Sequence, residues 1–213
     1  MIEEQAKDFL ETRPWLSGIC DSESTEELKN KYDSWANTYD ADVGEDWSFM
    51  PANIARTLSK LLPNKNATIL DAGAGTGLVG EALAKQGYTN LTAADLSEKM
   101  LAIARERQVY KALHQCNLED SPVFSNSVTF DAIIAAGVFA YAHAGVEVLN
   151  NLFCFLKEEG IFLLTIREDY RRKMQIDLDK LPWTLVSEED FPIYDEAKLM
   201  YLLAFKSDLR RLS

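Results

Sequence analysis

The feature that most constrains the fold is a glycine-rich segment, residues 71–77 (DAGAGTG), between an apolar segment at 68–70 and a helical pattern that begins near Leu78. Glycines in alternate positions allow a tight turn and let a ligand approach the backbone with no Cβ in the way. A strand, a glycine loop and a helix in this order are typical of an open α/β sheet, which presents its ligand crevice at such a turn. The segment therefore predicts a ligand site.

Strand-like and helix-like segments alternate after this loop. Residues 130–135 form a nearly continuous apolar run, as expected of a strand that is buried on both faces. The alternation predicts a parallel sheet connected by right-handed crossovers. Strand-like segments at 183–186 and 199–205, joined by an acidic loop, predict an antiparallel end to the sheet. In chain order, we expect strands at 68–70, 91–94, 111–116, 130–135 and 161–166, and helices at 78–86, 97–107 and 146–156.

The chain before the first strand has helical patterns. Ser24 is a suitable N-cap, and the acidic residues after it favour the first turn of a helix. A second helix is expected over 48–62, ended by Pro63. The apolar face of the first helix would carry four residues at helical spacing, namely Leu28, Tyr32, Trp35 and Tyr39.

Charge and composition limit the partners of the chain. Its formal net charge of −12 would repel a phosphate polymer, so a nucleic-acid partner is disfavoured and a neutral or cationic substrate fits better. No apolar run approaches the roughly 18 residues that span a bilayer, and the N-terminus lacks a signal-peptide pattern. We therefore expect a cytoplasmic protein with no membrane partner. The three cysteines lack C-x-x-C spacing, and no H-E-x-x-H pattern is present, which argues against a metal site.

The ligand of the glycine loop has two candidate classes. Residues 75–80 (GTGLVG) match the dinucleotide fingerprint, and Asp95 lies near the spacing expected for a ribose contact. Asp71 separates the classes, because its carboxylate at the strand end would face the ligand in the turn. A pyrophosphate would be repelled there, whereas an ammonium group could donate charge-assisted hydrogen bonds. Asp71 therefore favours S-adenosylmethionine, which has an ammonium group and no phosphate.

Residues 71–77 resemble the first motif of the class I S-adenosylmethionine-dependent methyltransferases, and later segments resemble further motifs of that family. Asp95 matches the acidic residue that binds the ribose hydroxyls. Residues 117–120 (NLED) fall where the family places its adenine-contacting loop, and 130–134 (FDAII) resemble its fourth strand. Residues 156–160 (LKEEG) resemble a turn usually written L-K-P-G-G, with two glutamates in place of the proline and the first glycine.

The N-terminal sequence narrows the resemblance. Residues 32–36 (YDSWA) and 39–40 (YD), with Val138-Phe139 later, are most similar to the Williams–Beuren-region methyltransferase-like group. The family implies an α/β, Rossmann-like fold, with a seven-stranded, mostly parallel sheet, an antiparallel C-terminal strand and an N-terminal helical cap. We expect one methyltransferase domain over 1–213, with the cap at 1–62 and the core at 63–213.

The resemblance also implies which residues hold the cofactor. Asp71 and the glycine loop would hold its methionine part, and Asp95 would accept from the ribose hydroxyls. Leu96 would pack on the adenine, opposite Asn117 or Leu118. The full set of expected cofactor-binding residues is Tyr32, Asp71, Gly73, Ala74, Gly75, Gly77, Asp95, Leu96, Asn117, Leu118 and Ala136.

Methyl transfer from a sulfonium is an in-line displacement, so the protein chiefly aligns donor and acceptor, and orientation alone can be worth about 7–11 kcal/mol. Tyr39, like Tyr32, either packs in the core or lines the methyl-transfer face, where an aromatic ring favours a nearby sulfonium. If a general base is used, His143 is the candidate, because it follows the fourth strand at the edge where acceptor-site residues collect. The alternative for His143 is an exposed loop position without a catalytic role.

Two other functions stay open on the sequence. The glycine fingerprint also fits an NAD(P)-dependent oxidoreductase, although few residues follow the core to supply a catalytic region. A methyltransferase-like domain could also bind its cofactor or a protein partner without turnover. The methyl acceptor, small molecule or protein, is not identified by the sequence.

Overall fold

A seven-stranded sheet organises the residues that the computed structural model describes, which are 19, 22, 24–120, 123–125, 128–139, 144–193, 198–208 and 210. Its strands are β1 (Ile69–Ala72), β2 (Leu91–Asp95), β3 (Tyr110–Gln115), β4 (Phe130–Phe139), β5 (Leu156–Arg167), β6 (Trp183–Ile193) and β7 (Lys198–Ser207), in the spatial order β3-β2-β1-β4-β5-β7-β6. The first five pair in parallel, whereas β7 runs antiparallel to both β5 and β6. The predicted mostly parallel sheet with an antiparallel C-terminal strand is confirmed.

Alternate residues of the central strands enter two cores on opposite faces of the sheet. Leu70 of β1 and Ile133 of β4 belong to one core, while Ile69 and Ile134 belong to the other. All four side chains are fully buried. This two-sided burial follows from the period-two geometry of a strand, and it explains why 130–135 is an unbroken apolar run.

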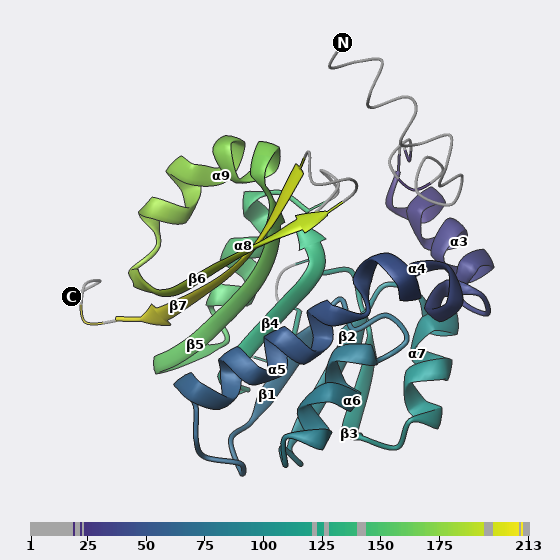
Figure 1. The fold of residues 1–213 in the computed structure, drawn as a ribbon, viewed down its shortest axis with the longest axis horizontal. Coiled ribbons are helices and arrows are strands. Elements are labelled where there is room, and N and C mark those ends of the chain that lie inside the picture. Colours follow the sequence, from purple (N-terminus) through teal and green to yellow (C-terminus); the bar gives the residue numbers. More distant parts are fainter. Residues whose placement is uncertain are drawn as a thin grey trace.

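Helices cover both faces of the sheet (Figure 1). α5 and α6 pack on one face through Ile54 and Leu83, whereas α8 and α9 pack on the other through Leu149 and Met174. The helices that the structure describes in full are α3 (Thr25–Trp35), α4 (Tyr39–Trp47), α5 (Phe49–Leu61), α6 (Leu78–Lys85), α7 (Glu98–Glu106), α8 (Val146–Phe153) and α9 (Glu168–Lys180). Within the described residues, no helix combines the length and the apolar character that crossing a membrane requires.

Two serines begin helices as the sequence predicts. The Ser24 hydroxyl accepts a hydrogen bond from the Glu27 N–H at 3.2 Å, and the Ser97 hydroxyl accepts one from the Met100 N–H at 3.1 Å. Such caps satisfy N–H groups that the first turn of a helix leaves unpaired. Ser97 is fully buried, so the cap of α7 lies inside the molecule.

The aromatic stripe expected on one N-terminal helix is divided between two helices. α3 ends at Trp35 and α4 begins at Tyr39, because the chain turns between them, where the Thr38 N–H donates to the Trp35 carbonyl at 3.0 Å. The rings remain together: the Trp35 ring centroid lies 4.6 Å from that of Tyr39 and 6.2 Å from that of Tyr32. The two tyrosines are therefore carried by different helices.

Two C-terminal elements differ from expectation. The sequence pattern does not reveal α9, because only Met174 and Leu178 are buried along it, too few to form an apolar stripe. The acidic segment 187–190, expected as a loop, is part of β6. Both of its glutamates pair with helices that cover the sheet, Glu188 with Arg171 of α9 and Glu189 with Arg56 of α5, each at 2.6 Å.

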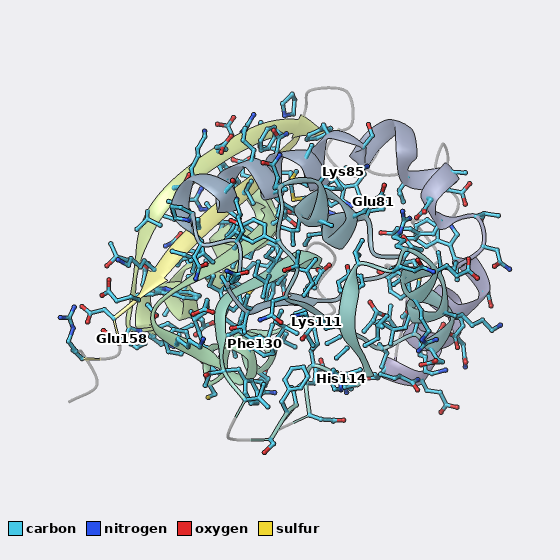
Figure 2. The ribbon with its side chains drawn as sticks, turned by 90° about the horizontal axis from the view of Figure 1, so that it is seen from below. Glu81, Lys85, Lys111, His114, Phe130 and Glu158 are labelled. Atoms are coloured by element: carbon cyan, nitrogen blue, oxygen red, sulfur yellow. The ribbon has the colours of Figure 1, made fainter. Side chains whose placement is uncertain are left out.

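The segment 156–160 leaves a residue other than glycine in a left-handed conformation. Glu159 has a φ of 60°, at the position where the resembling turn carries its first glycine. A Cβ in this region costs about 1–2 kcal/mol. The Glu159 carboxylate pairs with Lys206 and Arg210 at the outer end of the sheet, where Figure 2 labels the neighbouring Glu158. Exposed ion pairs of this kind contribute little to stability.

Replacing Glu159 with glycine is expected to raise the free energy of unfolding by about 1 kcal/mol relative to Glu159→Ala. Both variants lose the ion pairs, but only glycine removes the backbone strain. Urea unfolding followed by circular dichroism measures the difference. Equal stabilities of the two variants would show that the turn is not strained.

Candidate functional site

A cavity lies at the carboxyl ends of β1, β2 and β4, where the strand order reverses between β1 and β4. Open parallel sheets bind their ligands at this kind of position. The cap helices, the loops after β1, β2 and β3, the end of β4 and the start of α8 all contribute to its wall. The lining residues are Thr25, Leu28, Tyr32, Tyr39, Gly73, Gly75, Asp95, Leu96, Met100, Asn117, Leu118, Glu119, Ala136, Gly137, Val138, Ala144 and Val148.

The structure brings most of the expected site residues into this one wall. The expected residues that line the cavity are Tyr32, Tyr39, Gly73, Gly75, Asp95, Leu96, Asn117, Leu118 and Ala136. Three expected residues, Asp71, Ala74 and Gly77, are not in the lining. His143 lies outside the residues that the structure describes.

Sequence reasoning missed some of the lining. Met100 reaches the cavity from α7, and Val148 reaches it from α8. Both belong to the apolar faces of helices that pack on the sheet, so nothing in the sequence separates them from core residues. Leu28 is different, because its place on the aromatic stripe beside Tyr32 was a usable signal.

The glycine loop has the left-handed backbone that its sequence predicts. Gly73 and Gly75 have φ values of 73° and 54°. A Cβ on Gly73 would lie 2.5 Å from Val138 Cγ2, so the end of β4 closes over this residue. A Cβ on Gly75 would meet nothing within 4 Å, and its backbone faces open space beside the cavity.

Asp95 ties the loop after β1 to the loop after β2. Its Oδ2 accepts from the Gly75 N–H at 2.7 Å, and its Oδ1 accepts from the Ser97 N–H at 2.8 Å. Burial raises the pKa of this carboxyl, while the backbone donors from Ser97, Gly75 and Leu96 lower it. A carboxylate oxygen can accept more than one hydrogen bond, so Asp95 keeps acceptor capacity toward a ligand in the cavity.

Asp71 lies deeper than the sequence suggested. It is 1% exposed, and its Oδ2 accepts a hydrogen bond from the Tyr110 hydroxyl at 2.6 Å. Its Oδ1 has no hydrogen-bond partner among the described residues. The pKa of Asp71 is raised to about 7: burial, and to a lesser extent the charge of Asp95, raise it, while the Tyr110 hydroxyl and the Gly80 N–H lower it. The carboxylate thus lies beneath the glycine loop with one acceptor oxygen still unused.

α3 and α4 are attached through carboxylates to the loops after β2 and β1 that line the cavity. Asp33 of α3 accepts from the Ser97 hydroxyl at 2.5 Å, in the loop after β2. Asp40 of α4 accepts from the Thr76 hydroxyl at 2.5 Å, in the glycine loop, and pairs with Arg107. Arg107 also donates to the Thr76 carbonyl at 2.6 Å. These contacts hold Tyr32 and Tyr39 against the cavity.

The residues of the wall fit a zwitterionic nucleoside better than a dinucleotide. Its described lining holds two carboxylates, Asp95 and Glu119, and no lysine, arginine or histidine that could neutralise a pyrophosphate. Beneath this wall, the unpartnered Oδ1 of Asp71 is suited to an ammonium donor, because a buried acceptor without a donor is costly. Among the residues that the structure describes, no group of three or more His, Cys, Asp or Glu side chains could hold a metal ion.

Comparisons with known proteins agree with this geometry. Residues 70–164 match the methyltransferase domain family. The chain is 32% identical to human methyltransferase-like protein 27 over 157 residues, which are 70% of this chain and 64% of that protein. It is 38% identical to the ubiquinone biosynthesis O-methyltransferase of Hydrogenovibrio crunogenus over 149 residues, which are 67% of this chain and 61% of that protein. The chain thus spans less than two thirds of the length of these relatives.

Solved structures share the fold at low sequence identity. The magnesium protoporphyrin IX methyltransferase of Synechocystis with bound S-adenosylhomocysteine superposes with a TM-score of 0.63 at 13% identity, covering 86% of this chain and 99% of that one. The [4+2]-cyclase SpnF superposes with a TM-score of 0.71 at 13% identity, covering 88% of this chain and 98% of that one. These likenesses concern the fold alone.

The buried Asp71 carboxyl is expected to make the unliganded protein less stable as the pH rises. Its pKa in the folded chain, about 7, lies above the ordinary value of 3.8, so the folded state holds the proton more tightly. The resulting stabilisation is complete below about pH 4 and is lost as the pH rises through 7.

The variant Asp71→Asn has no proton to lose, so it should melt several degrees above the wild type at pH 8 and show no such gain at pH 4. Thermal unfolding of both proteins across this range measures the effect. If the difference in melting temperature between the two proteins were the same at every pH, the raised pKa of the buried Asp71 carboxyl would be ruled out.

Proposed function

We propose that this chain, which belongs to the class I S-adenosylmethionine-dependent methyltransferases, transfers the methyl group of that cofactor to an acceptor without net negative charge. The observation that carries the proposal is the wall of the cavity at the switch point of the sheet. It combines an open glycine backbone with carboxylates and, among its described residues, no basic side chain. Such a wall suits a ligand with an ammonium and a sulfonium group.

The positions of the residues expected to bind the cofactor support the following roles. Asp71 Oδ1, which is buried beneath the glycine loop and not in the cavity lining, is the acceptor proposed for the ammonium group. Asp95, in the lining, is the acceptor proposed for the ribose hydroxyls. Leu96 and Leu118 supply apolar surface for the adenine, with Asn117 beside them. S-adenosylmethionine supplies, when bound, a methyl group on a positively charged sulfur.

Ala74 and Gly77, also expected at the cofactor, act through the shape of the loop. The Ala74 N–H donates to the Ala94 carbonyl at 3.1 Å, and the Gly77 N–H donates to the Ala74 carbonyl at 2.9 Å. These bonds hold the turn in which Gly73 and Gly75 reach the cavity. Ala136 contributes to the wall directly, from the end of β4.

The acceptor side is proposed to lie under α3 and α4, where Tyr32 and Tyr39 line the cavity together with Val138. Aromatic and apolar side chains there exclude water and orient the acceptor, and alignment is the main task of the protein in this reaction. The net charge of −12 also disfavours anionic acceptors. His143 stays the candidate general base for an acceptor that must lose a proton.

The fold alone does not establish methyl transfer. A cyclase shares this architecture, and one fold can support unrelated activities. The competing function is therefore a domain that binds the cofactor without transferring its methyl group. Turnover has to be measured separately from binding.

Calorimetric titration is expected to show binding of S-adenosylhomocysteine, with no binding of NAD⁺ at the same concentrations. Asp95→Asn should weaken S-adenosylhomocysteine binding at least tenfold, because a charge-assisted acceptor is lost at about 1.5–3 kcal/mol. Glu106→Gln, which changes an exposed acid at the other end of α7, is the matched control and should bind normally.

A homocysteine-release assay then tests turnover. Amines, phenols and thiols form one acceptor panel, and carboxylates and phosphate esters form the other. Product from the first panel only is the expected result. Binding without product from either panel would favour the non-catalytic function, and product from the anionic panel alone would refute the proposed acceptor class.

The variant Tyr39→Ala tests whether the Tyr39 ring lines the methyl-transfer face or only packs in the core. A ring near the sulfonium favours S-adenosylmethionine over uncharged-sulfur S-adenosylhomocysteine, so its removal should lower that preference by roughly two- to thirtyfold. Tyr39→Phe keeps the ring and should keep the preference. Unchanged affinities and unchanged turnover in Tyr39→Ala would leave Tyr39 with a packing role only.

A further inference from the structure

Tyr110 is the only described side chain that hydrogen bonds to the buried carboxylate of Asp71, and no sequence motif marks it. It begins β3, which is separated from β1 by β2. Its side chain must therefore reach beneath the glycine loop to place its hydroxyl 2.6 Å from Asp71 Oδ2. A tyrosine so placed is part of the support of the site.

Two glycines make room for the Tyr110 ring. A Cβ on Gly80 would lie 2.2 Å from the Tyr110 hydroxyl oxygen, and a Cβ on Gly77 would lie 3.1 Å from its ring. Gly77 and Gly80 are the last two glycines of the segment 75–80 that matches the dinucleotide fingerprint. In this chain, their small size admits a tyrosine against the first turn of α6.

We propose that Tyr110 is a positioning residue for the amino-acid end of the cofactor: its hydroxyl holds Asp71 through Oδ2 and keeps Oδ1 as the acceptor for the ammonium group. This inference rests on the proposed function, because it assumes a ligand with an ammonium group. What it adds is that the position and ionisation of the Asp71 carboxylate depend on the Tyr110 hydroxyl.

The charged and polar groups around Asp71 determine whether loss of the Tyr110 hydroxyl raises or lowers the pKa of Asp71. Tyr110 from β3 and the Gly80 N–H from α6 favour the ionised carboxylate, whereas burial and Asp95 from β2 oppose it. Burial and the charge of Asp71 raise the pKa of the Tyr110 hydroxyl, whereas the positive charge of Arg107, at the end of α7, lowers it. Removing the Tyr110 hydroxyl removes one of the two favourable contacts, so the pKa of Asp71 rises and less carboxylate is present at neutral pH.

Cofactor affinity should follow the ionisation of Asp71. An ammonium ligand needs the carboxylate, so wild-type affinity for S-adenosylhomocysteine should fall about tenfold between pH 8 and pH 6. Tyr110→Phe should bind roughly three- to tenfold more weakly than the wild type at pH 7. The midpoint of its profile should lie at higher pH, and Asp71→Asn should bind weakly with no inflection near 7.

Tyr88→Phe is the matched control. Tyr88 is 1% exposed, and its hydroxyl donates to the Leu62 carbonyl at 2.5 Å, away from the cavity. This variant also loses a buried tyrosine hydroxyl, so it should lose stability without moving the pH profile of binding. A merely structural role for Tyr110 predicts that Tyr110→Phe behaves in the same way.

The experiment is calorimetric titration of S-adenosylhomocysteine from pH 6 to pH 8.5, together with carbon NMR titration of the Asp71 carboxyl in the unliganded proteins. The inference is supported if Tyr110→Phe shifts both the pH profile of binding and the titration of the Asp71 carboxyl, and if Tyr88→Phe shifts neither. Wild-type binding with an unmoved Tyr110→Phe profile would overturn it while leaving the proposed function intact. Absence of wild-type binding at every pH would instead overturn the proposed function, and this inference with it.

Discussion

The loop after β1 and the loop after β2 are tied to each other, and the site depends on that tie. The Asp95 carboxylate accepts from Gly75 and Ser97, and the Ala94 carbonyl accepts from the N–H groups of Gly73 and Ala74 at 2.8 and 3.1 Å. These bonds join two neighbouring parallel strands where their chains leave the sheet. These bonds hold the glycine loop in the conformation in which Gly73 and Gly75 line the cavity.

The second constraint is a carboxylate buried without a full set of partners. Burying the Asp71 carboxyl beneath the glycine loop, with one oxygen unpartnered, costs folding free energy. Sites that bind ligands often keep such a group because its cost is recovered when the ligand donates to it. The Tyr110 hydroxyl reduces the cost for one oxygen and leaves the other without a partner among the described residues. In the proposed function, the stability of the empty protein and its affinity for an ammonium ligand are linked through the same atoms.

The cap helices use carboxylates in a related way. α3 buries none of its own residues, so apolar packing alone does not hold it on the core. Asp33 and Asp40 instead reach the two loops that Asp95 joins, and Arg107 links α4, the glycine loop and Glu81 of α6. The position of Tyr32 and Tyr39 at the cavity thus depends on the loops after β1 and β2, which also line it. Asp40 and Glu81 are paired with Arg107 and Asp33 with Lys29, and among these acidic side chains only Asp95 lines the cavity.

The sequence by itself determined the features that depend on local pattern. The glycine loop follows from residues 71–77, the strands of the parallel sheet follow from short apolar runs, and the caps at Ser24 and Ser97 follow from single side chains. Asp95 was also predictable, because it follows the glycine loop near the spacing expected for a ribose contact. The tertiary structure decided the contacts between distant residues.

Tyr110 meets Asp71 across 39 residues, and Arg107 meets Asp40 across 67. The order of the strands brings these side chains together, and no periodicity in the chain records it. For the same reason, the depth of Asp71 was misjudged: a strand pattern shows that a residue is at the end of β1, but only packing against β3 and α6 decides which way its carboxylate points.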